Sequence, residues 1–195
     1  MINIYDYYIM KNKTKKNKTK KNKTKKNKTK KNKTKKNILK AICVLHHNKY
    51  NVKGTVSFIQ NIKNNITEIH YDITGLKDGY HGFHIHKYGD LTDGCNSSCE
   101  HFNPFNKKHG GCDSLDRHIG DLGNIFSLNN KAKGIIKDNL ISLNMKSKKC
   151  IIGRCVVIHE DKDDLGLGLN KESLKTGNAG KRLACGVIGL SNFSI

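Results

Sequence analysis

The sequence contains no run of about 18 apolar residues, so it has no candidate transmembrane helix. It has one proline and no stretch of helical period, so little α-helix is expected. Apolar residues make up only 35% of the 195 positions, below the usual share of about 45 to 50%. Part of the chain therefore does not contribute to a packed core. The first ten residues lack the basic start of a secretory signal, and we expect no export.

Acidic and apolar residues are both missing from Lys11 to Lys35, which consists of five copies of KNKTK and carries 15 lysines. This composition cannot bury enough surface to offset chain entropy, so residues 1–37 are predicted to be a disordered basic tail and 38–195 a folded domain. The domain retains a formal charge of only +6 of the chain's +21. The tail could bind nucleic acid or an anionic surface, but its simple repeat favours a solvated extension without function.

The cysteine count of seven is odd and too low for a disulfide scaffold in a chain of this length. Without an export signal, most of these cysteines are expected to be free thiols in a reducing compartment. The predicted location is the cytoplasm, which would be that of the host cell if a virus encodes the chain.

From Ile38 onward the chain changes to short β-prone segments broken by glycine and asparagine. Residues 52–58 and 69–73 alternate apolar and polar side chains, as strands with one buried face do. Further strands are expected within 41–45, 134–143, 150–159 and 184–190. We predict an all-β sandwich or barrel in which two glycine- and charge-rich stretches, 87–124 and 160–182, form long loops. Loops of such length are usually functional or held by a metal or a disulfide.

Histidines are concentrated in one part of the chain, with six of the ten between His81 and His118. His84 and His86 are two positions apart, so on a strand both imidazoles point to one face and form a pair of nitrogen ligands. Each histidine alone is more often an ordinary surface or hydrogen-bonded residue, and we interpret His46, His47 and His70 in that way.

The first predicted loop supplies further candidate metal ligands at short intervals, and they are His101, His109, His118 and Asp121. Three imidazoles and one carboxylate match a closed tetrahedral zinc site. Copper(II) prefers tetragonal coordination, so a histidine-rich set that can adopt this geometry suits copper(II) instead. The residues alone predict a metal site and leave both metals open.

Six motifs occur in the order HGFHIHKYGD, HFNP, KHGG, RHIGDLGN, HEDKDDLG and GNAGKRLACGVIG. In these motifs and their spacing, the chain resembles the copper/zinc superoxide dismutases from about Lys40 to Leu190. The resemblance implies an eight-stranded Greek-key β-barrel with two functional loops and one copper and one zinc ion per subunit. It also implies that the enzyme converts superoxide to oxygen and hydrogen peroxide.

By this resemblance, the copper ligands are His84, His86, His101 and His159, and the zinc ligands are His101, His109, His118 and Asp121. His101 is thus shared between the metals and takes part in catalysis. Asp163 resembles the carboxylate that hydrogen-bonds an imidazole of each metal site, a role that orients metal-bound histidines.

The resemblance assigns four further features. Arg182 resembles the guanidinium that docks the anion beside copper, and Lys175 lies in a loop that steers substrate. Lys171 stands where the family usually has an acidic residue, and we expect it to attract anions as well. Cys95 and Cys185 match the disulfide of the family, which is exceptional for a cytoplasmic protein.

The family also implies a homodimer formed through apolar barrel surface, with GVIGL and CIIGR in the interface, and a partner that delivers copper. The other cysteines are predicted to be idle or buried thiols, with Cys99 and Cys112 in the metal loop and Cys43, Cys150 and Cys155 as core fillers. Two other classes of function stay open. One is a metal carrier on the same fold, and the other is a nucleic-acid-associated protein, which only the tail supports.

Overall fold

The structure is a computed structural model that describes residues 37–45 and 50–192. The predictions for the tail before Asn37 and for His46 and His47 fall outside these residues. No helix in the described part of the chain is long and apolar enough to cross a membrane.

Within the described residues, the fold consists of eight strands and two very short helices. The strands are β1 (Ile38–Leu45), β2 (Lys53–Asn61), β3 (Ile66–Thr74), β4 (Gly79–His86), β5 (Asp121–Ser127), β6 (Lys131–Asp138), β7 (Cys155–His159) and β8 (Arg182–Leu190). The helices are η1 (Asn96–Ser98) and α2 (Ser173–Thr176), each within one of the two long loops.

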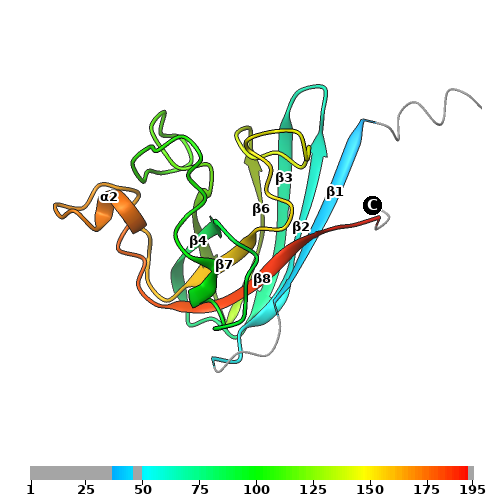
Figure 1. Ribbon diagram of the computed structural model, residues 1–195. Coiled ribbons are helices and arrows are strands. Elements are labelled where there is room, and N and C mark those ends of the chain that lie inside the picture. The colour runs from blue at the N-terminus through cyan, green and yellow to red at the C-terminus, as the bar shows by residue number, and fades with distance from the viewer. Residues whose placement is uncertain (1–36, 46–49, 193–195) are drawn as a thin grey trace, which may run out of the picture. The chain divides into compact units, whose positions relative to one another are not determined.

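All paired strands are antiparallel, and their order in the sheet is β5-β4-β7-β8-β1-β2-β3-β6. The pairings of β3 with β6 and of β4 with β7 are long-range, so hairpins alone do not build the sheet. The sheet curls into a nearly closed barrel, and the two long loops extend from one side of it (Figure 1). This confirms the predicted all-β, eight-stranded Greek-key class.

The barrel interior is filled by the apolar positions of the alternating strands. On β2 the inward residues Val56 and Phe58 are fully buried, and on β3 Ile69 and Ile73 are fully buried. Ile85 of β4 and Ile158 of β7 join the same core. Since burying one such side chain contributes about 1.5 to 3 kcal/mol, this layer supplies the main driving force for closing the barrel.

β4 and β7 are buried on both faces, unlike the strands opposite them. Phe83 and Ile85 point into the core, so the alternating His84 and His86 point to the outer face. The long loops cover that face, and Gly120 shows how closely they pack, because a Cβ there would overlap the Ile85 carbonyl oxygen. The outer face of β4 thus becomes an interior rich in imidazoles.

Three predicted boundaries differ from the structure. β5 begins at Asp121, so the first loop ends four residues earlier than the predicted 124. β6 ends at Asp138 and does not continue to 143, because the Asp138 carboxylate accepts the backbone N–H groups of Leu140 and Ile141 and turns the chain. Similarly, residues 150–154 lie outside β7, and Cys150 is only partly buried, so it is not the core filler that we predicted.

Candidate active site

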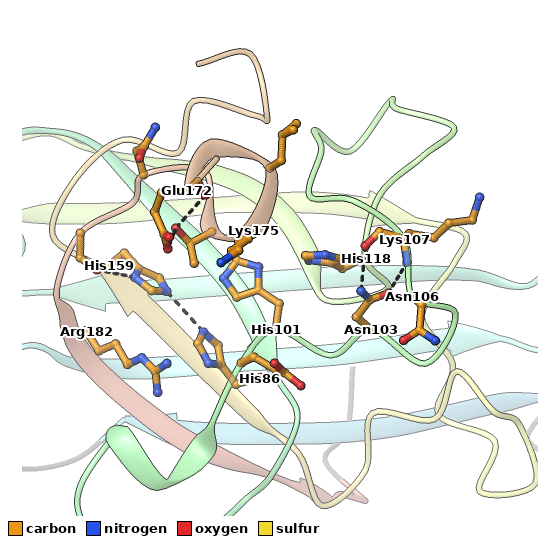
Figure 2. Close-up of a pocket in the computed structure, with 15 residues that line it drawn as sticks. His86, His101, Asn103, Asn106, Lys107, His118, His159, Glu172, Lys175 and Arg182 are labelled. Carbon is orange, nitrogen blue, oxygen red and sulfur yellow. Dashed lines mark hydrogen bonds between the residues drawn. The ribbon is translucent and has the colours of Figure 1, made fainter. Parts of the chain in front are cut away.

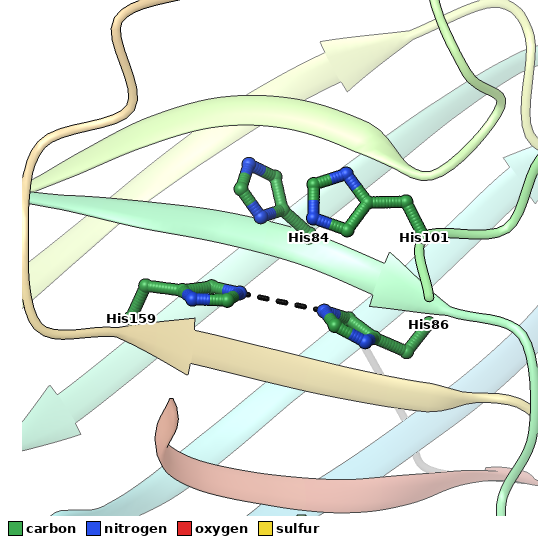
Figure 3. Close-up of side chains that lie close together, drawn as sticks. All are labelled: His84, His86, His101 and His159. Atoms are coloured by element: carbon green, nitrogen blue, oxygen red, sulfur yellow. Dashed lines mark hydrogen bonds between the residues drawn. The ribbon is translucent and has the colours of Figure 1, made fainter. Parts of the chain in front are cut away.

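The first cluster of imidazoles gathers where β4 and β7 lie side by side. His84 and His86 project from β4, and His159 ends β7. His101 reaches the cluster from the first loop, where its backbone forms a bridge with His86. Figure 3 shows the four rings directed toward one another. One nitrogen from each ring lies within 4.8 Å of the others, and all four residues are buried.

The hydrogen bonds of these rings show which nitrogen carries the proton. The carbonyl oxygens of Cys99 and Gly180 can only accept, so His86 and His159 donate through Nδ1 at 2.7 and 3.1 Å. Their Nε2 atoms then carry lone pairs, and these two atoms face each other at 3.4 Å (Figure 3). Because two lone pairs repel, a cation between them would stabilise this arrangement.

A second cluster adjoins the first and is centred on Asp121. The Nδ1 atoms of His101, His109 and His118 lie 2.9, 3.1 and 3.1 Å from Asp121 Oδ1. Asp121 opens β5 opposite His84, so the sheet register places this carboxylate beside β4. Three imidazoles and a carboxylate form the donor set of a closed tetrahedral zinc site. His101 belongs to both clusters and presents one ring nitrogen to each.

Buried ring nitrogens without hydrogen-bond partners test whether metals fit here. Among the described residues, His84 Nδ1, His101 Nε2 and His109 Nδ1 are buried and make no hydrogen bond. An unsatisfied buried polar atom costs about 1 to 3 kcal/mol, and three in one place are unusual for a native core. Each lies in a group that could hold an ion. The donor sets therefore fit one copper and one zinc ion.

Asp163 forms a hydrogen bond with one imidazole of each cluster. Its Oδ2 accepts from His84 Nε2 at 2.7 Å and its Oδ1 from His109 Nε2 at 2.8 Å. These bonds leave Nδ1 of both rings directed into the clusters. The Asp163 backbone is in turn held by the Asn124 side-chain amide in two hydrogen bonds of 2.8 and 2.9 Å. Gly177 is required beside this carboxylate, because its φ is 65° and a Cβ would overlap Asp163 Oδ1.

The pKa values follow from burial and from these partners. Burial, reinforced by His101, lowers the pKa of His84 and His86 well below the usual value, and burial also lowers the pKa of His159 to about 4. These rings are therefore neutral near pH 7 and keep their lone pairs. Although burial opposes the change, the close contacts of the His101, His109 and His118 rings with the carboxylate lower the pKa of Asp121 well below its usual range. It is therefore an anion that can bind a cation.

A solvent-connected cavity of about 790 Å³ leads to the first cluster. His86, His101, His159 and Arg182 line its inner part, and α2 with its neighbours forms one wall (Figure 2). The structure places the predicted steering residue Lys175 in this wall. Lys171 is exposed but is not among the described residues that line the cavity.

The guanidinium of Arg182 is fixed by the first loop. Nη1 donates to the Cys95 carbonyl at 2.7 Å, and Nη2 donates to the Cys99 carbonyl at 2.6 Å. The Cys95–Cys185 disulfide joins this loop to β8, which confirms the predicted pairing. Burial lowers the pKa of Arg182, but a guanidinium of such high basicity stays charged. A permanent cation therefore lies in the cavity beside the imidazoles.

Several residues of the cavity and the cluster region differ from what the sequence indicated. His81, one of the six clustered histidines, joins neither group, since both its ring nitrogens lie 2.9 Å from backbone carbonyls. Sequence reasoning did not identify nine of the described residues that line the cavity, among them Asn103, Lys107, Thr176 and Asn178. They lie on loops and carry no spacing signal, so only the folded loops bring them together.

Comparison with known proteins agrees with this geometry. Residues 52–188 match the family described as copper/zinc superoxide dismutase (SODC). The chain belongs to this family. A relative named superoxide dismutase [Cu-Zn] from Paramecium bursaria Chlorella virus 1 is 58% identical over 140 residues, which cover 71% of this chain and 73% of the relative.

Cellular relatives of the same family match over nearly their whole length. Superoxide dismutase [Cu-Zn] A from Xenopus laevis is 53% identical over 152 residues, 78% of this chain and 98% of the relative. The protein named superoxide dismutase [Cu-Zn] from Yarrowia lipolytica is 48% identical over 156 residues, 79% of this chain and 99% of the relative. These matches confirm the resemblance derived from the six motifs.

Proposed function

We propose that this chain is an enzyme that converts two superoxide ions and two protons into one molecule of oxygen and one of hydrogen peroxide. The observation that carries the proposal is the single ring of His101, which points Nδ1 at the Asp121 cluster and its unpartnered Nε2 at the other imidazoles. Such a ring can bridge two cations. Family membership supports the same reaction.

The donor sets assign the two metals to the two clusters. Four imidazoles suit copper, and His84, His86, His101 and His159 would hold it. Three imidazoles and one carboxylate suit zinc, and His101, His109, His118 and Asp121 would hold it. When bound, copper supplies the one-electron chemistry, and zinc supplies fixed positive charge on the far side of the shared ring.

The protein's own residues supply binding and proton transfer. Arg182 provides a fixed positive charge for a small anion at the inner end of the cavity, and Lys175 attracts the anion along the wall. His101 exchanges a proton at Nε2, which makes no hydrogen bond, while Nδ1 stays beside Asp121. Asp163 keeps His84 and His109 in one orientation, so that their Nδ1 atoms remain available.

Assembly and location extend the proposal. Exposed apolar side chains on the adjacent strands β1 and β8, Val44 and Val187, support a homodimer through this face, because contiguous apolar surface marks interfaces. We place the enzyme in the cytoplasm, that of the host if the chain is viral, and expect a copper-delivery partner there. Lys171 is proposed as a steering charge outside the cavity wall.

The test measures copper and zinc content together with superoxide turnover on one preparation. The expected result is one ion of each metal per chain and turnover far above that of the same copper in solution. His101→Gln should lose the coupling between the metals and most turnover, whereas His70→Gln, at a half-buried histidine that pairs with Glu68 outside both clusters, should match the wild type. A fully loaded wild-type protein without turnover would instead identify a metal carrier.

A further inference from the structure

Asp164, the neighbour of Asp163, receives three hydrogen bonds within the second loop. Its Oδ1 accepts from the Gly166 N–H at 2.9 Å and from Ser173 Oγ at 2.7 Å. Its Oδ2 accepts from Asn178 Nδ2 at 2.6 Å. Its backbone N–H also donates to the Gly177 carbonyl at 2.8 Å. One side chain therefore fastens three separate points of the loop.

Two of these points, Ser173 and Asn178, stand at the two ends of the segment that forms the cavity wall. α2 begins at Ser173 and ends two residues before Asn178, and it carries Lys175 and Thr176 into the lining. A four-residue helix has too few internal hydrogen bonds to be stable alone. Its position must come from bonds outside it, and Ser173, which is fully buried, and Asn178 provide them.

We propose that Asp164 is a positioning residue that clamps both ends of α2 and so sets the place of Lys175 in the substrate channel. The inference rests on the proposed function, because it assigns Lys175 the steering of an anion. A carboxylate suits this role, since charge-assisted hydrogen bonds are stronger than neutral ones and both its oxygens accept. Asp163 hydrogen-bonds His84 and His109, and its neighbour Asp164 hydrogen-bonds the cavity wall. Two adjacent residues therefore connect the wall to the metal clusters.

Asp164→Asn tests the clamp with almost no change in volume. If the new side-chain carbonyl keeps the Gly166 and Ser173 donors, the new amide nitrogen faces Asn178 Nδ2, and two donors oppose each other. The exposed Asp161 in the same loop provides the matched control, because Asp161→Asn makes the same charge change without touching α2. A swap, Asp164→Asn with Asn178→Asp, restores one donor and one acceptor. Position 178 has φ 52°, which aspartate tolerates.

Two measurements decide the proposal, and the first does not depend on turnover. Hydrogen exchange at the amides of Gly168 and Gly177, which donate to Ser173, should accelerate at least tenfold in Asp164→Asn. It should stay at the wild-type rate in Asp161→Asn and recover partly in the swap. The second measurement is kcat/KM for superoxide as a function of ionic strength.

For Asp164→Asn we expect kcat/KM to fall about five- to tenfold, with a flatter salt dependence, as for Lys175→Met. Adding Lys175→Met to Asp164→Asn should then have little further effect. Wild-type exchange and wild-type salt dependence in Asp164→Asn would overturn the clamp. If that variant does not fold, Ser173→Ala, which releases one end of α2, replaces it. The same changes in amide exchange and in the salt dependence of kcat/KM are then expected, and their absence would overturn the clamp. A wild-type enzyme without turnover would reject the proposed function, while the exchange data would still decide the clamp.

Discussion

At the scale of single residues, the acceptor that holds one nitrogen of an imidazole decides which nitrogen can bind a metal. Asp163 accepts a hydrogen bond from Nε2 of His84, so this ring offers Nδ1 to a metal. Backbone carbonyls accept hydrogen bonds from Nδ1 of His86 and His159, so these rings offer Nε2 to a metal. The sequence indicates the ligand type, but these acceptors lie far away along the chain, and only folding assigns the nitrogen.

Arg182→Ala is expected to lower turnover about ten- to a hundredfold, the scale of one lost electrostatic contact in an active site. It should also weaken inhibition by small anions such as azide, because the fixed charge that attracts them is gone. Steady-state rates and azide inhibition constants check both effects. Arg182→Lys is the control, since it keeps the charge but loses the fork that contacts the Cys95 and Cys99 carbonyls. An unchanged rate in Arg182→Ala would show that this residue does not serve the site.

The thiol of Cys112 should react slowly and in a strongly pH-dependent way. Burial raises its pKa to about 11, against an ordinary value of 9.0. At pH 8 about one thiol in a thousand is then ionised, and alkylation should rise about tenfold per pH unit up to that pKa. The exposed Cys99 is the internal reference. Iodoacetamide labelling followed by peptide mass spectrometry measures both sites, and faster labelling of Cys112 than of Cys99 at pH 8 would contradict the expectation.

At the scale of elements, the site depends on two strands whose outer faces are covered. Alternation on β4 places His84 and His86 on one face, which the spacing of two residues already predicted. His159 ends β7 and Asp121 opens β5, while the first loop supplies His101, His109 and His118. The path of this loop is set by contacts such as that of Gly120 with β4. A stretch with little regular structure therefore supplies three of the seven residues in the two clusters.

Removing the disulfide by Cys185→Ser should lower the free energy of unfolding by about 4 to 5 kcal/mol, because the bridge closes a loop of 90 residues. It should also lower turnover, since the loop that holds Arg182 loses its attachment to β8. Urea denaturation and rate measurements check the two effects. Cys150→Ser, at a partly buried free thiol, is the control with the same atomic change. An equal loss of stability in both variants would mean that the bridge contributes nothing of its own.

Sequence patterns predicted the elements unevenly, and the reasons are physical. The alternating strands β2 and β3 were predicted because one of their faces is buried. The start of β5 was missed, because Asp121 and Asn124 look like loop residues until their side chains bind imidazoles and the Asp163 backbone. Position 139–143 looked like a strand, but the Asp138 carboxylate turns the chain there. The disulfide could be predicted only from the family resemblance, since the residues alone favoured free thiols.

At the scale of the whole molecule, charge is divided unequally between the two parts of the chain. Sixteen lysines and one acidic residue precede Asn37, and the rest of the chain carries +6 of the total +21. In the proposed function, superoxide is attracted by charge near the cavity, which Arg182 and Lys175 line. Screening over about 8 Å at physiological salt means that only charges close to the anion contribute strongly to this attraction.

Deleting residues 1–36 should therefore leave superoxide turnover unchanged at physiological ionic strength. The deletion retains Asn37, whose carbonyl accepts the Ile62 N–H at 3.0 Å next to the start of β1. The same variant should elute from a heparin column at much lower salt, because each lysine that neutralises an anionic group adds to the salt dependence of binding. Replacing the 15 lysines of the repeats by glutamine in the full-length chain separates charge from length. Loss of activity in a folded, metal-loaded truncation would show that the tail contributes to catalysis, and unchanged elution would show that it does not bind polyanions.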